Sequence, residues 1–330
     1  MTKTNIKSDS IQNFIFENQP ARGCIIHLNN SITEILNKHD YPIIIQNLIA
    51  ESIVSTLFLF SICKTKGRLT LQMIGEGELK LLSVRANTEG QIRALAQYDK
   101  DKINAKTKIK DLTDILRLGR LSVTFEPEHS KDNAYRFQSM IPVLEGSVAN
   151  AMESYFNLSV QNPAKIIIQS DIKKDNKKDN KQNKTPKISA FILQYLPPAS
   201  NSSNKNNKNN LNSLSKDELL EKFNELSILA ESLRPDEINN TDNKVLLKKL
   251  YHNEDITIFN SKELSFYCGC SKDKMQSAII SAGKEEALAI LEEQKTPDQN
   301  SEAELVVTCE FCLKHYSFNR QDVENLFIEH

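Results

Sequence analysis

The chain has 330 residues, of which 39% are hydrophobic and 26% are charged, a composition typical of a folded protein with two or three domains. Its formal net charge at pH 7 is −1, so no overall field would attract nucleic acid or an anionic membrane surface. Residues 1–14 are polar and lack the apolar core of a secretory signal, so we expect a cytoplasmic protein in a reducing compartment.

Helical and strand patterns are mixed through the first part of the chain. The predicted helices are residues 33–38, 42–63 and 146–156, and the predicted strands are residues 68–73, 79–84, 92–97, 121–125, 164–169 and 187–195. This mixed order predicts an α+β fold, in which residues 1–199 form an N-terminal mixed α/β core domain.

The most apolar stretch of the chain lies within the second of these helices, at residues 43–63. It contains Gln46, Asn47 and Glu51, and polar or charged groups are costly in the middle of a membrane. We therefore predict a buried helix of the core domain and no membrane partner.

Two polar tracts interrupt the pattern. Residues 171–187 carry seven Lys and three Asp, a local charge of +4, and residues 200–210 consist of Asn, Ser and Lys. Segments with so few apolar side chains cannot offset their own ordering entropy by burial. We interpret the first tract as a solvated loop at a hairpin tip, because an RNA-binding tongue would need aromatic side chains for base stacking. The second tract marks a domain boundary.

Residues 200–260, which begin with the second tract, are predicted to form a helical linker that responds to the redox chemistry described below. Ser215 and Glu218 have the spacing of a helix capping box. Apolar residues then recur at helical spacing along two short segments: Leu219, Phe223, Leu226 and Leu233, followed by Val245, Leu246, Leu247 and Leu250. Short helices gain most of their stability from packing, so these stripes must dock on a neighbour and are adhesive when undocked.

Four of the six cysteines form two close pairs near the end of the chain. The pairs are Cys268-Gly-Cys270 and Cys309-Glu-Phe-Cys312. Four thiolates can complete a tetrahedral shell with Zn–S bonds of about 2.3 Å, and all-sulfur ligation favours zinc over hard cations. Such a shell leaves no open position for hydrolytic chemistry, so we expect a structural or regulatory zinc site and no enzyme. Residues 261–330 are therefore predicted to form a small C-terminal zinc-binding domain.

The remaining candidates for ligation or thiol chemistry have simpler interpretations. His315 follows Cys312 closely enough to compete as a ligand, but four cysteines already fill the shell, so a surface or supporting role is expected. Cys24 and Cys63 lie in apolar contexts and are predicted to be small core residues.

The paired cysteines are also candidates for a redox switch. Zinc-bound cysteine is already the thiolate that oxidants attack, and metal binding contributes on the order of 10 kcal/mol or more to the folding of a small domain. Oxidation would eject the ion and unfold the domain, and a linker docked beside it would then loosen and expose its apolar stripes. Spacing alone does not separate this hypothesis from a zinc ribbon that never opens.

Three other functions fit parts of this pattern. A nucleic-acid-binding zinc ribbon conflicts with the charge of residues 261–330, where seven Lys and Arg stand against thirteen Asp and Glu, a difference of −6. A thiol-disulfide oxidoreductase that uses Cys309 and Cys312 would place the first cysteine at a helix N-terminus, whereas a strand-like segment precedes it. A constitutive binding protein with structural zinc predicts client binding that peroxide does not change.

Short motifs along nearly the whole chain match one family pattern. In the C-terminal part they are Phe266-Tyr-Cys-Gly-Cys-Ser271, Gly283-Lys-Glu-Glu286, Val307-Thr-Cys-Glu-Phe-Cys312, Tyr316-Ser-Phe318 and Asp322-Val323. In the N-terminal part they include Arg22-Gly23, Tyr41-Pro42, Lys66-Gly-Arg-Leu-Thr-Leu-Gln72, Gly75-Glu-Gly77, Gly119-Arg-Leu121 and Leu193-Gln-Tyr-Leu-Pro197. In these motifs and in their order, the chain resembles the redox-regulated 33 kDa chaperonin, or heat-shock protein 33, family.

The resemblance implies a cytoplasmic, ATP-independent holdase that acts in the stress response. It implies that Cys268, Cys270, Cys309 and Cys312 bind Zn²⁺ in an inactive, reduced monomer. On oxidation these cysteines form the disulfides Cys268–Cys270 and Cys309–Cys312, zinc leaves, the linker unfolds and the protein dimerises. The active form holds unfolded clients, which later pass to ATP-dependent chaperones for refolding.

The chain departs from the family pattern at several places outside the cysteines. Ile49-Ala-Glu-Ser52 stands where the family usually has Leu-Gly-Glu-Ala, Ser159-Val-Gln161 replaces Ser-Glu-Gln, and Ser189-Ala190 replaces a glycine pair. The two polar tracts and residues 294–301 are interpreted as insertions. These departures concern loop geometry and dimer contacts.

Overall fold

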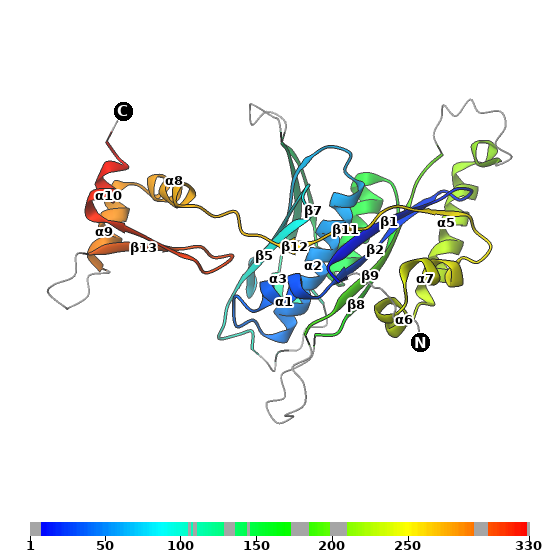
Figure 1. The fold of residues 1–330 in the computed structure, drawn as a ribbon, viewed down its shortest axis with the longest axis horizontal. Helices are drawn as coiled ribbons and strands as arrows, with labels where there is room; N and C mark the ends of the chain where they lie inside the picture. The colour runs from blue at the N-terminus through cyan, green and yellow to red at the C-terminus, as the bar shows by residue number, and fades with distance from the viewer. Residues whose placement is uncertain are drawn as a thin grey trace, which may run out of the picture. The chain divides into compact units, whose positions relative to one another are not determined.

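The computed structural model of the chain describes residues 8–104, 107, 111–128, 136–143, 146–172, 185–198, 210–293 and 303–328. It forms two compact units, Met1–Phe266 (unit 1) and Tyr267–His330 (unit 2), which Figure 1 shows as ribbons. Residues 173–184, 200–209 and 294–301, which make up most of the polar tracts and the third insertion, lie outside the described residues. Their roles, and the functional division at residues 199 and 260, stay predictions.

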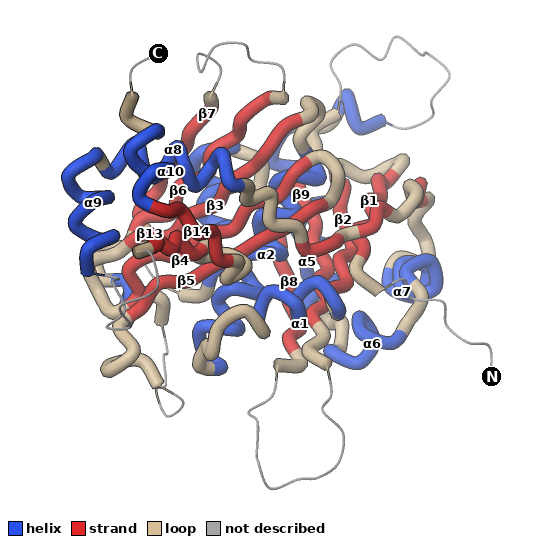
Figure 2. Tube along the Cα trace, turned by 60° about the vertical axis from the view of Figure 1, so that its left-hand side comes forward, coloured by secondary structure: helices blue, strands red, loops and turns tan. Residues whose placement is uncertain are grey.

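Unit 1 contains two six-stranded sheets within its described residues, drawn in red in Figure 2. Sheet A has the order β10-β1-β2-β9-β8, and β11 also pairs with β1. Sheet B has the order β12-β5-β4-β3-β6-β7, in which β12 pairs with β5 in parallel. The strands of sheet A are β1 (Ser10–Phe16), β2 (Ala21–Leu28), β8 (Ala164–Ser170), β9 (Ile188–Tyr195), β10 (Ile256–Ile258) and β11 (Lys262–Glu263). Those of sheet B are β3 (Gly67–Ile74), β4 (Leu79–Asn87), β5 (Gln91–Tyr98), β6 (Arg120–Pro127), β7 (Phe137–Pro142) and β12 (Ser265–Phe266).

Helix α2 (Ile43–Ile62) is the centre of the unit 1 core, where it contacts strands of both sheets. It is long and apolar enough to cross a membrane, but 67% of its most apolar stretch is buried within the protein, as the prediction of a core helix requires. Its polar side chains are satisfied locally, since the hydroxyls of Ser52 and Thr56 each donate to a carbonyl one turn earlier at 2.7 Å. The other helices of this core are α1 (Asn30–Leu36), α3 (Thr113–Leu116), α4 (Val148–Tyr155) and the π-helical turn Phe156–Val160.

Strands β1, β2 and β7 were not among the predicted elements, although the nine predicted helices and strands of this region are all present. Strand β2 is buried on both faces, so its sequence lacks the alternation that reveals a half-buried strand. Gly23 lies in its middle because a Cβ there would come within 2.3 Å of the Ile192 carbonyl on β9.

Unit 2 combines a two-stranded hairpin with short helices in its described residues. Its elements are α8 (Lys272–Ala282), α9 (Lys284–Glu293), β13 (Glu304–Thr308), β14 (His315–Asn319) and α10 (Arg320–Asn325). The buried apolar core that they share is small: Ile279, Ala287, Leu291, Leu305, Phe318 and Val323. A core of this size stabilises a folded unit only marginally, so a unit of this kind needs a further staple.

The predicted linker forms helices that pack on the face of sheet A opposite α2. These helices are α5 (Lys216–Glu231), α6 (Pro235–Asn240) and α7 (Asn243–Leu250), preceded by the 3₁₀ turn Asn210–Ser213. Ser215 and Glu218 form the predicted capping box. The stripe residues Leu219, Phe223, Leu226 and Leu233 are buried against Phe14, Phe16, Phe191 and Tyr195 of the sheet, which confirms that the stripes dock. Of the second stripe, Leu246 and Leu247 are buried, whereas Val245 is 48% exposed.

A buried histidine joins the linker to the sheet. His27 on β2 is 5% exposed, and its ring lies between Ser189 Oγ (Nδ1, 2.9 Å) and Asn243 Oδ1 (Nε2, 2.9 Å). The Asn243 amide in turn donates to Gln12 Oε1 on β1 at 2.8 Å. Burial lowers the pKa of His27 below its usual value of 6.5, although the bond to Asn243 opposes this shift. The linker therefore docks on a neutral imidazole.

This network predicts that acid weakens the fold of unit 1. Because the pKa of His27 is lower in the folded than in the unfolded chain, the unfolded chain binds the proton first as pH falls below about 6.5. Urea unfolding should therefore show a lower midpoint at about pH 5.5 than at about pH 7.5, and the non-titrating variant His27→Gln should lose less between the two. An equal loss in both proteins would show that His27 does not sense pH.

Candidate metal centre

The four predicted ligands come from two loops of unit 2. Cys268 and Cys270 precede α8, whose N-cap Ser271 accepts a hydrogen bond from the Lys274 amide. Cys309 and Cys312 lie in the turn between β13 and β14. In this turn the Cys309 amide donates to the Lys314 carbonyl at 2.9 Å, and the Leu313 amide donates back to the Cys309 carbonyl at 2.8 Å. Leu313 takes a left-handed conformation with φ of 61°, which closes the turn.

The four sulfurs converge on one point. All of them lie within 4.8 Å of one another, and the Sγ–Sγ distances Cys268–Cys309 and Cys270–Cys312 are both 3.5 Å. In a regular tetrahedron with Zn–S bonds of 2.3 Å, neighbouring sulfurs are separated by about 3.8 Å. A disulfide would need about 2.05 Å, and all four cysteines are free thiols in this structure. The donors and their spacing therefore fit a four-coordinate soft metal ion.

The thiols disturb one another's ionisation. Burial alone would raise the pKa of Cys270, but hydrogen bonds from Tyr316 and the neighbouring cysteines stabilise its thiolate and lower its pKa to about 7. Burial and hydrogen bonds with the other three cysteines raise the pKa of Cys312 to about 12, and burial also raises the pKa of Cys268. The values separate because a second thiolate beside the first is repelled. A bound divalent cation removes this conflict and lets all four ionise.

Gly269 fits its place between two ligands for a steric reason. Its φ is not left-handed, so the backbone conformation alone does not require glycine here. A Cβ at this position would instead come within 3.2 Å of the Tyr267 ring. The Lys274 ammonium donates to the Gly269 carbonyl, which fixes the short loop to α8.

The other candidates lie where their sequence contexts indicated. The exposed ring of His315 bonds through Nδ1 to Thr308 Oγ1 at 2.8 Å, and among the described residues the group that could hold a metal consists of the four cysteines. Cys24 is 1% exposed in the unit 1 core, and Cys63 is half-buried with its thiol bonded to the Leu59 carbonyl.

Tyr316 is the functional residue that sequence reasoning missed. Its hydroxyl donates to Cys270 Sγ at 3.1 Å. A hydrogen bond to a ligand sulfur orients it and withdraws charge from it, as supporting residues of metal sites do. The available signal was the alternation of β14, which places Tyr316 and Phe318 on the same face of the hairpin.

Comparison with known proteins identifies the chain. A family model described as Hsp33 protein matches residues 9–319. The chain belongs to the Hsp33 family. The 33 kDa chaperonin of Proteus mirabilis (strain HI4320) is 27% identical over 320 residues, which cover 97% of this chain and 96% of that protein. The 33 kDa chaperonin of Pasteurella multocida (strain Pm70) is 29% identical over 325 residues, which cover 98% and 99%.

A solved structure shares the Hsp33 fold. The crystal structure of the 33 kDa chaperonin (heat shock protein 33 homolog) from Thermotoga maritima matches with a TM-score of 0.70 at 16% sequence identity, over 96% of this chain and 97% of that chain. The family resemblance and the α+β fold class predicted from sequence are both confirmed. The protein is an Hsp33-family chaperone with a four-cysteine cluster that could hold a metal ion.

We predict that replacing a single cysteine of the cluster is enough to abolish metal binding. The reduced Cys268→Ser variant should lose stoichiometric zinc, because a serine hydroxyl is a hard and protonated donor that does not replace a thiolate. Metal content measured by atomic emission on purified protein checks this. Cys63→Ser is the matched control and should keep its zinc, since Cys63 belongs to the unit 1 core. Full zinc in Cys268→Ser would contradict the assignment.

Proposed function

We propose that this chain is a redox-regulated, ATP-independent holdase that oxidation of Cys268, Cys270, Cys309 and Cys312 activates. The observation that carries the proposal is the convergence of these four sulfurs within 4.8 Å in a unit with a small core. The reduced form holds Zn²⁺ and is an inactive monomer. The oxidised form is a dimer that holds unfolded proteins in the cytoplasm until ATP-dependent chaperones refold them.

Zinc makes the cluster both stable and reactive. It keeps all four sulfurs as thiolates, which are the nucleophiles that peroxide attacks. Each pair of thiolates would give two electrons to one hydrogen peroxide molecule and form one disulfide, while the two peroxide oxygens take up two protons from solvent and leave as two water molecules. Disulfide sulfur no longer carries the negative charge that held the cation, so zinc leaves once the cage is oxidised.

The proposed disulfides are Cys268–Cys270 and Cys309–Cys312. The two Sγ–Sγ distances of 3.5 Å join the other combinations, Cys268 to Cys309 and Cys270 to Cys312. All edges of a tetrahedron are alike, so distances in the reduced site do not select a pairing. Once the unit opens, cysteines two or three positions apart stay close, whereas those 41 or 42 residues apart separate. Chain connectivity therefore supports the local pairs.

Loss of the ion would unfold unit 2, because little else stabilises this unit. Metal binding contributes on the order of 10 kcal/mol to folding in small zinc domains, and the buried core of this unit has only six apolar residues among those described. We propose that residues 261–330 act as the switch and that residues 200–260 are the linker that undocks. Undocking would uncover Phe14, Phe16, Phe191 and Tyr195 on sheet A, together with the linker's own stripes. Residues 1–199 would then bind clients and dimerise.

The geometry disfavours the oxidoreductase alternative. Such an enzyme needs an exposed first cysteine at a helix N-terminus, whereas Cys309 is 6% exposed and lies in a hairpin turn. A constitutive binding protein with structural zinc would have the same site geometry. The aggregation test below distinguishes it from a redox-regulated chaperone.

The proposal predicts that oxidation switches on suppression of aggregation. A thermally unfolded client should scatter as much light with the reduced chain as without it, and much less with an equimolar amount of peroxide-treated chain, in the absence of ATP. Reducing the oxidised chain in the presence of zinc is the matched control and should restore scattering. Equal suppression by both forms would mean constitutive binding, and turnover of insulin disulfides would mean an oxidoreductase.

A further inference from the structure

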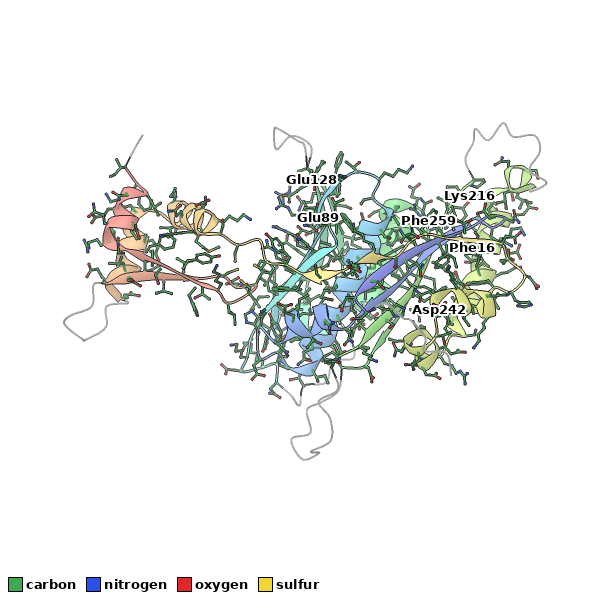
Figure 3. The ribbon with its side chains drawn as sticks, in the orientation of Figure 1. Phe16, Glu89, Glu128, Lys216, Asp242 and Phe259 are labelled. Atoms are coloured by element: carbon green, nitrogen blue, oxygen red, sulfur yellow. The ribbon has the colours of Figure 1, made fainter. Side chains whose placement is uncertain are left out.

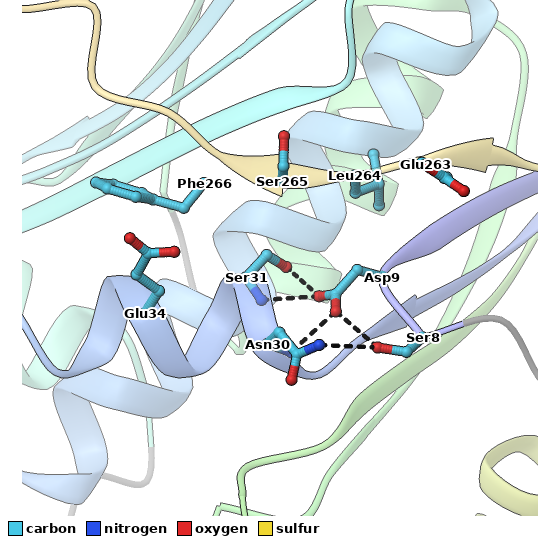
Figure 4. A pocket seen from close by; sticks show the side chains of 9 residues that line it. All are labelled: Ser8, Asp9, Asn30, Ser31, Glu34, Glu263, Leu264, Ser265 and Phe266. Atoms are coloured by element: carbon cyan, nitrogen blue, oxygen red, sulfur yellow. Dashed lines mark hydrogen bonds between the residues drawn. The ribbon is translucent and has the colours of Figure 1, made fainter.

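Residues 256–266, here called the strap, form a narrow band that runs along the edges of both sheets of unit 1. The strap contributes β10 and β11 to the edge of sheet A, beside β1, and β12 to the edge of sheet B, beside β5. Figure 4 shows its last residues, Glu263–Phe266, passing over Asp9 and Ser31. The strap is thus an extended segment bound in register on two sheet edges.

The strap is held to β1 mainly by backbone hydrogen bonds. The Phe259 amide donates to the Asn13 carbonyl at 3.0 Å, and the Leu264 amide donates to the Asp9 carbonyl at 2.8 Å. The Glu17 amide, just after β1, donates to the Asp255 carbonyl at 2.9 Å. The antiparallel register pairs Phe14 with Ile258, Ile15 with Thr257 and Phe16 with Ile256.

Most side chains of the strap are only partly buried or are exposed. Ile256 and Ile258 pack against the apolar cluster between sheet A and the linker, Phe266 packs against the unit 1 core, and the Lys262 ammonium donates to the Thr88 carbonyl. Leu264 is its one buried residue, and Phe259, labelled in Figure 3, is 51% exposed. Two cavities of about 300 and about 240 Å³ lie against it, the first lined in part by Asp9, Glu34 and Phe266. Release of the strap would therefore withdraw one buried side chain, Leu264, from the unit 1 core.

The β1 edge beneath the strap has no protection of its own. Its sequence, Ser10-Ile-Gln-Asn-Phe-Ile-Phe16, has no charge, no Pro and no Gly, and is rich in residues that favour strands. The opposite edge of sheet A is different. There Lys165 on β8 pairs with Glu231 at 2.5 Å, and Glu153 accepts the Ile166 amide at 2.9 Å. In the part of the chain that the structure describes, charged side chains cover the β8 edge, whereas the strap covers the β1 edge.

We propose that the strap is a removable edge strand, and that the β1 edge it uncovers binds an extended segment of an unfolded client by antiparallel strand addition. This inference rests on the proposed function, because the strap ends two residues before Cys268 and would be released when unit 2 opens. The strap itself shows that the edge accepts an extended chain. Backbone pairing is independent of client sequence, which suits a chaperone that must hold many different unfolded proteins.

The first test uses the oxidised full chain and two fluorescent peptides with the same apolar, uncharged side chains. One has a free backbone, and the other is N-methylated at its four central residues, which removes the donors on both of its edges. Anisotropy should show that N-methylation weakens binding by about tenfold or more. Equal affinity for the two peptides would overturn the inference, and so would binding of neither.

A pair of variants locates the edge. The Glu17 amide points at the strap, so the Ile15 amide, two residues earlier, points the same way. Ile15→Pro removes that donor, whereas Ile15→Ala shortens the side chain and keeps it. After oxidation, Ile15→Pro should bind the free-backbone peptide several-fold more weakly than Ile15→Ala. Equal binding by the two variants would place the peptide elsewhere.

Hydrogen exchange covers the case in which Ile15→Pro does not fold. In the oxidised wild-type chain, amides of β1 should lose protection and regain it when the free-backbone peptide is added. Protection that returns at high protein concentration without peptide would show that a second copy occupies the edge, against the inference. If oxidised protein suppresses aggregation while β1 gains no protection from peptide, the proposed function survives and the inference fails.

Discussion

Four cysteine sulfurs held within 4.8 Å of one another are the constraint on which the rest of this structure depends. Without a cation neighbouring thiolates repel, and the pKa of Cys270 is lowered to about 7 while that of Cys312 is raised to about 12. With a divalent metal ion they attract it together and join two loops that are about forty residues apart in sequence. Under the proposed function, the thiolates that would hold unit 2 closed around a metal ion are also the groups that an oxidant would attack.

The apolar surfaces of unit 1 are covered by chain segments that differ in how deeply they are buried. The α2 side of sheet A is packed into the large core. The other side is covered by the short helices α5–α7, and the β1 edge by a strap whose single buried side chain is Leu264. These covers follow one another in sequence and lead directly to Cys268. Under the proposed function, a chain that loses its metal ion would therefore loosen first next to the segments that cover its apolar surfaces.

Sequence reasoning predicted the parts of this arrangement whose signals are local. The cysteine pairs identify a soft-metal site by donor type alone, and the helical spacing of Leu219, Phe223 and Leu226 predicts a docked amphipathic helix. Strand β2 escaped prediction because burial on both faces removes its alternation. The strap escaped because strands of two or three residues have no measurable period. The roles of His27 and Tyr316 depend on partners brought close by folding, so no pattern along the chain predicts them.

The most direct test of the account is to follow zinc and the linker together in one oxidation experiment. Peroxide is titrated into the reduced full-length chain, released zinc is measured with a chromogenic chelator, and hydrogen exchange of the α5–α7 amides is measured on the same samples. The account predicts that linker protection falls in proportion to the zinc released. Complete zinc release with α5–α7 still protected, or loss of protection while zinc stays bound, would contradict it.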